Sequence, residues 1–144
     1  MVASTRGPFR LHAEVLGALP VVDHFLVRLG LAGLLDDHLP ARDGRVQLAP
    51  AKAIGVVVRN LALSHQPLYS FNEWVGGHDP AVLGLEPDEV ALINDDRVGR
   101  ALERLFEADR SSLLGRLVLD AVASFDVDCS ELHNDSTSVS LHGT

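Results

Sequence analysis

The chain has 144 residues, of which 47% are hydrophobic and 22% are charged, and its formal net charge is −8. This length and apolar content argue against intrinsic disorder and allow one domain with a hydrophobic core, or one domain followed by part of another. The single cysteine, Cys129, excludes an internal disulfide and a Cys-rich zinc site. Because no apolar run approaches the roughly 20 residues of a membrane span, we expect a cytoplasmic protein without membrane contact.

Residues 1–10 are expected to be a leader, and residues 11–125 a helical domain. The apolar residues of this domain recur at helical spacing, in segments separated by proline and glycine. Pro20 and Pro50 suit the first turn of a helix, where the missing N–H of proline would have no partner. The segments expected to be helical are residues 20–29, 31–39, 50–64, 87–92, 95–108 and 111–125, with short helical turns after Ser70 and after Asp79.

The clearest buried helix is residues 50–64, in which Ala53 and Ile54 are expected to face the core. Lys52, Arg59 and Asn60 are expected on its solvent side. In the last helix, Leu114, Leu117 and Val118 are among the residues expected to face inward. 

Four helix starts have candidate caps, the first of which is Asp79, directly before Pro80. Ser70 and Glu73 match a capping box, in which each side chain bonds the other residue's backbone N–H. Asn94 or Asp95 is expected to cap the helix that follows it, and Ser111 or Ser112 to open the last one.

After Phe125 the pattern changes. Residues 126–130 form a polar connector, and residues 131–141 are rich in Ser, Thr and Val, which predicts an extended strand. Alternate side chains of a strand share one face, so His133, Asp135 and Thr137 would lie together. A carboxylate on a rigid strand is a suitable start for a Mg²⁺ site, because this hard cation prefers oxygen ligands.

The segment Leu132–Gly143, with the sequence LHNDSTSVSLHG, resembles the first catalytic strand of insertion-sequence transposases with a DDE active site. Three upstream blocks resemble the front domain of the same family: Leu19–Pro40, Pro67–Tyr69 and Asn94–Leu105. The resemblance covers roughly residues 11–144. It rests on several blocks in the same order, since Asp-Ser-Thr alone would be a weak signal.

The resemblance implies a mainly α chain, in which a helical N-terminal domain (11–125) precedes the first strand or strands of a truncated RNase H-like α/β catalytic domain (126–144). In such enzymes three acidic residues hold two Mg²⁺ or Mn²⁺ ions, which activate the attacking hydroxyl and stabilise the leaving oxygen during DNA cleavage and strand transfer. Asp135 would be the first catalytic metal ligand. The other two acidic residues are expected beyond residue 144, so the fragment is expected to be inactive.

The implied partner is DNA that carries the terminal inverted repeats of a mobile element, and a homo-oligomer is a further option. Arg97, Arg100 and Arg104 lie three, four and seven residues apart on one helix and could contact DNA phosphates. Asp96 and Arg100 are, however, also spaced for a surface ion pair, which favours a solvated face.

The two strand residues also have ordinary interpretations. Asp135 could bond the local backbone, as Asp before Ser or Thr often does, although the upstream blocks favour the metal ligand. His133 could orient the site or could equally be a packed or solvated histidine. The aromatic residues Tyr69, Phe71 and Trp74 could stack on bases, but packing of a loop against the core is the preferred interpretation.

The charge is unevenly distributed. Residues 1–72 contain seven Arg or Lys and five Asp or Glu, whereas residues 73–144 contain five Arg and fifteen Asp or Glu. Any DNA contact must therefore be local. Beside the transposase, the alternatives are a non-catalytic helical module that binds DNA ends or a partner protein, and an unrelated metal-dependent hydrolase. The hydrolase is the weakest, since one Asp and one His supply too few ligands.

Overall fold

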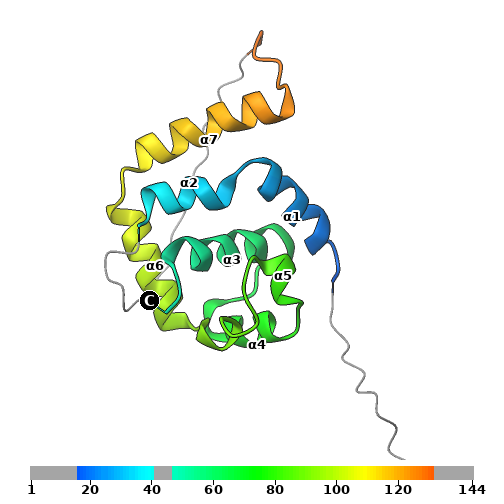
Figure 1. Cartoon of the computed structure of the whole chain (residues 1–144), viewed down its shortest axis with the longest axis vertical. Helices are drawn as coiled ribbons and strands as arrows, with labels where there is room; N and C mark the ends of the chain where they lie inside the picture. Colours follow the sequence, from blue (N-terminus) through cyan, green and yellow to red (C-terminus); the bar gives the residue numbers. More distant parts are fainter. Residues whose placement is uncertain (1–15, 41–46, 132–144) are drawn as a thin grey trace, which may run out of the picture.

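A computed structural model describes residues 16–40 and 47–131 of the chain (Figure 1). Within these two ranges the secondary structure is helical, with no strand. The α-helices are α1 (Leu19–Arg28), α2 (Leu31–His38), α3 (Pro50–Leu63), α4 (Phe71–Gly76), α5 (Pro80–Leu83), α6 (Asp95–Glu107) and α7 (Arg110–Phe125), and the 3-10 turns are η1 (Leu68–Ser70) and η2 (Val90–Leu92). The expected mainly helical architecture is confirmed, whereas the expected strand lies outside the described ranges except for Glu131.

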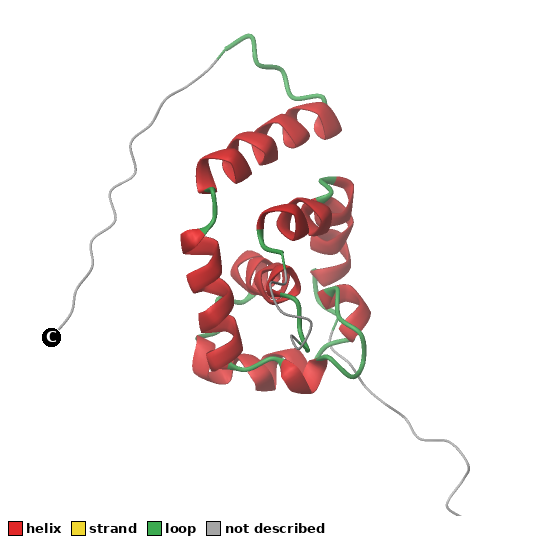
Figure 2. Ribbon diagram, turned by 60° about the vertical axis from the view of Figure 1, so that its left-hand side comes forward, coloured by secondary structure: helices red, strands yellow, loops and turns green. Residues whose placement is uncertain are grey.

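Helix α3 is the centre of the bundle and contacts α1, α2, α5 and α6. Around it, α1 and α2 lie on one side, α4 and α5 on the other, and α6 runs along one end (Figure 1). Helix α7 forms an outer layer over α2, as Figure 2 also shows. The core is built mainly from aliphatic side chains, and its most completely buried members are Leu19, Val56, Phe71, Val75, Leu83, Ile93 and Val98.

Helix boundaries follow the proline and glycine signals of the sequence. Proline stands in the first turn of α1, α3 and α5. Gly30 separates α1 from α2 with a φ of +70°, a left-handed conformation that glycine adopts without strain. Asn94 caps α6, because its side chain accepts the backbone N–H of Arg97 at 2.9 Å, and Asp79 caps α5 in the same manner. These caps are confirmed.

Two expected helix starts are wrong. Ser70 makes no cap bond, and its hydroxyl donates instead to the carbonyl of Pro67. The reason is that Ser70 ends η1 with φ −103° and ψ 9°, outside the extended conformation of a capping serine. Helix α7 starts at Arg110 and is capped by Asp109, which accepts the backbone N–H of Ser112 at 3.0 Å.

Two expected helix faces are also wrong. Arg59 and Asn60 are only 8% and 2% exposed, because α3 is covered on several sides and has no wide solvent face. On α7 the buried residue is Leu113, while Leu114 and Val118 are each 59% exposed. Helix α7 is apolar on more than one side, so its sequence pattern did not identify the side that meets the bundle. In the described parts of the chain, no helix combines the length and the apolar character that crossing a membrane requires.

Candidate functional site

Helix α6 carries the three arginines considered for DNA contact. Arg97 donates to the side-chain oxygen of Gln47 at 2.9 Å and is half-buried. Arg100 pairs with Asp96 at 3.3 Å, the ion pair that their spacing predicted. Arg104 is half-buried, and its Nη1 is enclosed without a hydrogen-bond partner among the described residues. Of the three side chains, only that of Arg100 stands out in solvent, at 70% exposure.

The surroundings of Arg100 are acidic. It lines a shallow hollow on the outer side of α6 together with Asp95, Asp96, Glu103 and Gly99. Three carboxylates therefore surround one guanidinium, and the local field opposes the approach of a phosphate. An exposed i,i+4 pair such as Asp96–Arg100 stabilises a helix by only about 0.3–0.5 kcal/mol.

The N-terminus of α6 offers little further attraction for an anion. A helix start attracts phosphate through its unpaired backbone N–H groups. Here the N–H of Arg97 already donates to Asn94, and the N–H of Asp96 donates to Asp95 at 2.9 Å. The two acidic side chains of the first turn, Asp95 and Asp96, add like charge to any incoming anion.

A polar centre that the sequence did not reveal lies at Arg59, inside the bundle. Its Nε donates to the carbonyl of Val82 at 2.9 Å, its Nη1 donates to the carbonyl of Gly55 at 3.1 Å, and its Nη2 pairs with the carboxylate of Asp23. One guanidinium thus joins α3 to α1 and to α5. The charge is tolerated in the interior because it is both paired and hydrogen-bonded.

Two glycines make room for this guanidinium. A Cβ added at Gly55 or at Gly84 would lie 3.4 Å from a nitrogen of Arg59, and Gly84 also has a left-handed φ of +74°. Gly55 lies in the middle of α3, where glycine costs about 1 kcal/mol relative to alanine. A glycine four residues before an arginine, within a mostly apolar helix, was therefore the sequence signal that could have indicated a buried arginine.

A pocket of about 140 Å³ lies beside Arg59, among α1, α2, α3 and α5. Most of its lining is apolar, and its charged members are Arg59, Lys52 and Asp36. Lys52 pairs with Glu89 at 2.6 Å, and Arg59 pairs with Asp23. Since each cation has its own carboxylate, the pocket has no surplus positive charge with which to bind an anion.

The carboxylate of Glu89 is held in its charged form. Burial by itself would raise the pKa of Glu89, but the backbone N–H of Glu86 and the ammonium group of Lys52 outweigh it and lower that pKa. The Glu86 N–H donates to Glu89 at 2.8 Å. Together these bonds fix η2 against α3, so Lys52 and Glu89 have a structural role.

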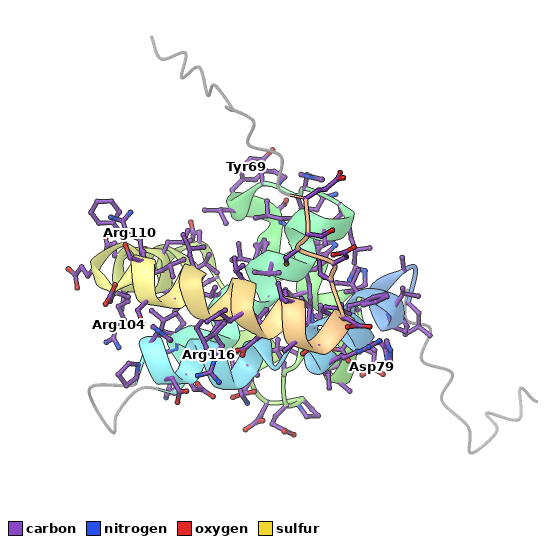
Figure 3. All side chains as sticks on the ribbon, turned by 90° about the horizontal axis from the view of Figure 1, so that it is seen from above. Tyr69, Asp79, Arg104, Arg110 and Arg116 are labelled. Carbon is purple, nitrogen blue, oxygen red and sulfur yellow. The ribbon has the colours of Figure 1, made fainter. Side chains whose placement is uncertain are left out.

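The aromatic cluster is largely part of the core. Phe71 is fully buried, and Trp74 packs against it with ring centroids 5.6 Å apart. The packing interpretation is confirmed for these two residues. Tyr69 differs, since it is 86% exposed (Figure 3).

The two residues expected at the metal site, Asp135 and His133, lie outside the described residues. Within residues 16–40 and 47–131, no group of three His, Cys, Asp or Glu side chains is placed to hold a metal ion. Cys129, in the connector, is exposed.

A family model described as a domain of unknown function, DUF4277, matches residues 11–119, which include all of α1 to α6 and most of α7. No curated protein and no solved structure matches the chain.

Proposed function

The chain belongs to the DUF4277 family, whose description names no activity, and we propose from its own residues that it is the N-terminal portion of an insertion-sequence DDE transposase. The observation that carries this proposal is the ordered set of four blocks, ending in the Asp135 segment, that resemble this class of enzyme. In the full enzyme, metal-dependent DNA cleavage and strand transfer would depend on Asp135.

The arrangement of the helices supports the grouping of the upstream blocks. Leu19–Pro40 forms α1 and α2, and Asn94–Leu105 forms most of α6. All three helices pack on α3, so these blocks belong to one core. Helix α7 ends at Phe125, where Asp126 turns the chain with a φ of +52°. The Asp135 segment then follows as a separate unit of sequence.

Asp135 would hold one of two divalent ions, whose chemistry is to activate the attacking hydroxyl and to stabilise the leaving oxygen. One carboxylate cannot hold two ions. We therefore expect purified residues 1–144 to show no strand cleavage or strand transfer with Mg²⁺ or Mn²⁺. Metal-dependent nicking of terminal-repeat DNA by this chain, abolished by Asp135→Ala, would contradict that expectation.

The test of the proposed function uses the complete reading frame at the native locus and the DNA that flanks it. The flanks should carry inverted repeats, and the frame should encode further Asp and Glu motifs. Asp135→Asn should abolish cleavage of the repeat ends. Asp128→Asn is the matched control, because Asp128 is exposed in the connector and its bond within the described residues is to the backbone N–H of Ser130. Equal activity of wild type and Asp135→Asn, or an intact short gene without repeats, would overturn the proposal.

The second candidate is a non-catalytic helical interaction module. A specific observation favours protein over DNA as its partner. The three α6 arginines are paired, half-buried or surrounded by carboxylates, whereas several large apolar side chains are exposed on α7. Binding of wild type to a protein partner, with no preference for terminal-repeat DNA, would favour this candidate.

A further inference from the structure

The pocket beside Arg59 has the size of a single ring. Four helices of the bundle, α1, α2, α3 and α5, bound it, and each contributes leucine, valine or alanine side chains to its walls (Figure 1). Its volume is about 140 Å³. An apolar cavity of roughly 150 Å³ in another protein holds one benzene molecule. The pocket can therefore take a molecule built on one ring, whereas a nucleotide or a large cofactor is too big for it.

The charges around the pocket favour a neutral ligand. Arg59 is paired with the carboxylate of Asp23, and Lys52 with that of Glu89. Asp36 adds a third carboxylate to the lining, and its side chain is exposed. Two cations and three carboxylates leave no positive surplus, so the local field opposes an anion. A cation would gain little, because a single exposed carboxylate attracts it only weakly in water.

The guanidinium of Arg59 forms part of the pocket wall. Gly55 and Gly84 both line the pocket, and a Cβ added at either would lie 3.4 Å from a nitrogen of Arg59. Three of the five N–H groups of the guanidinium donate to Val82, Gly55 and Asp23. The other two have no acceptor among the described residues. Since this side chain is mostly buried, a ligand oxygen that accepts one of these N–H groups would form a hydrogen bond to a charged donor, which is stronger than a neutral one.

We propose that the pocket binds a small neutral molecule that combines one aromatic ring with a carbonyl oxygen, and that this oxygen accepts an N–H of Arg59. The ring packs against the apolar walls, and burial of its surface supplies most of the affinity. A flat ring also suits the guanidinium, whose plane stacks on aromatic faces. The expected dissociation constant is about 0.1–3 mM, as for other molecules of this size. This inference concerns ligand binding and does not depend on the proposed enzymatic function.

The first test compares three probes of nearly the same shape. Benzamide is neutral, benzoate is an anion and benzamidine is a cation. The whole chain, isotopically labelled, is titrated with each probe, and its N–H signals are followed by NMR. Benzamide should shift the signals of Gly55, Gly84 and the Arg59 Nε–H. The signals of Gly99 and Gly115, which lie outside the pocket on α6 and α7, should stay in place. Benzoate and benzamidine should bind at least about fivefold more weakly.

The second test isolates the carbonyl oxygen. Acetophenone and ethylbenzene have the same shape, but ethylbenzene carries a methylene group in place of the carbonyl. Acetophenone should bind at least about fivefold more tightly, because only its oxygen can accept from Arg59. Hydrophobicity alone would favour ethylbenzene. A preference for acetophenone therefore reports the hydrogen bond and not the burial of apolar surface.

The third test closes the pocket. Ala32 lines it from α2 and is exposed, so Ala32→Phe obstructs the pocket without overpacking the core. Ala51→Leu fills the same pocket from α3. Each substitution should weaken the binding of benzamide by at least about tenfold. Ala123→Phe is the matched control, since Ala123 is an exposed alanine of α7 outside the pocket, and it should bind as wild type does. Unchanged circular dichroism should accompany all three variants.

Four outcomes would overturn the proposal. The first is the absence of a saturable shift at Gly55 and Gly84 with benzamide up to about 20 mM, several times the expected dissociation constant. The second is tighter binding of benzoate or benzamidine than of benzamide, which would contradict a neutral ligand. The third is tighter binding of ethylbenzene than of acetophenone, which would remove the role of Arg59. The fourth is unchanged binding to both Ala32→Phe and Ala51→Leu, which would place the probe elsewhere.

Discussion

Arg59 is the residue whose role changed most between sequence and structure. Its bonds to Val82, Gly55 and Asp23 join three helices, so its loss would leave both a cavity and an unpaired, half-buried carboxylate. Breaking a buried ion pair at one partner is more costly than the net stabilisation that the pair provides.

We therefore expect Arg59→Ala to lower the free energy of unfolding by about 3–5 kcal/mol, measured by urea denaturation. Arg100→Ala is the control, because Arg100 belongs to an exposed pair whose removal should cost less than about 0.5 kcal/mol. Similar losses for the two variants would contradict the structural role assigned to Arg59.

Glu89 should make stability depend on pH. Its pKa is lower in the folded chain than in the unfolded chain, so its stabilising contribution is complete above the unfolded value of about 4.3 and is lost as pH falls through the folded value. Glu89→Gln should thus be less stable than wild type by about 1 kcal/mol at pH 7.

This difference should shrink below about pH 4, in urea unfolding at several pH values. Glu103→Gln is the control, since Glu103 is exposed on α6, and its difference from wild type should stay near zero throughout. A Glu89→Gln difference that grows on acidification would show that the direction of the pKa shift is wrong.

At the scale of single elements, α6 is the helix whose start was best predicted. Asn94 has an extended backbone, with φ −152° and ψ 170°, and its side chain satisfies the N–H of Arg97. The geometry is that of an N-cap, which stabilises the helix by bonding an otherwise unpaired donor.

Asn94→Ala should lower the free energy of unfolding by about 1 kcal/mol, because alanine cannot accept this bond. Asn94→Asp should stay within a few tenths of a kcal/mol of wild type, since aspartate also caps and interacts favourably with the helix dipole. Thermal or urea unfolding measures both. Equal losses for the two substitutions would mean that the cap bond is not the cause.

At the scale of the whole molecule, charge limits the binding of nucleic acid. The second half of the chain carries fifteen acidic residues against five arginines, and Arg100, the exposed arginine of α6, lies within this acidic surface. Neutralisation of DNA phosphates by Lys and Arg supplies most of the non-specific affinity of a protein for DNA. An acidic surface offers few such contacts.

We expect weak binding to random duplex DNA at physiological salt, and at best a modest preference for cognate terminal repeats. Arg100→Ala should leave the salt dependence of binding to random DNA unchanged. A salt titration with both DNAs measures this. A loss of about one unit of salt slope on the terminal repeats would instead identify a phosphate contact at Arg100.

The sequence by itself determined the helical class and most helix boundaries. Helix starts and turns depend on residues that shape their own stretch of backbone, as Pro20, Pro50 and Asn94 do in a first helical turn and Gly30 does between two helices. These effects can be recognised without knowledge of the rest of the molecule. The resemblance and the expected metal ligand, Asp135, also rest on sequence alone.

Only the tertiary structure decided which sides of the helices are buried. Arg59 is internal because α1 brings Asp23 to it and α5 brings the carbonyl of Val82. Asp23 is 36 residues away from Arg59 in sequence. On α7 either apolar side could have met the bundle, and contacts with α2 place Leu113 rather than Leu114 in the core. Burial depends on distant neighbours, whereas helix starts depend on adjacent residues, and this is why the boundaries could be predicted and the polar centre could not.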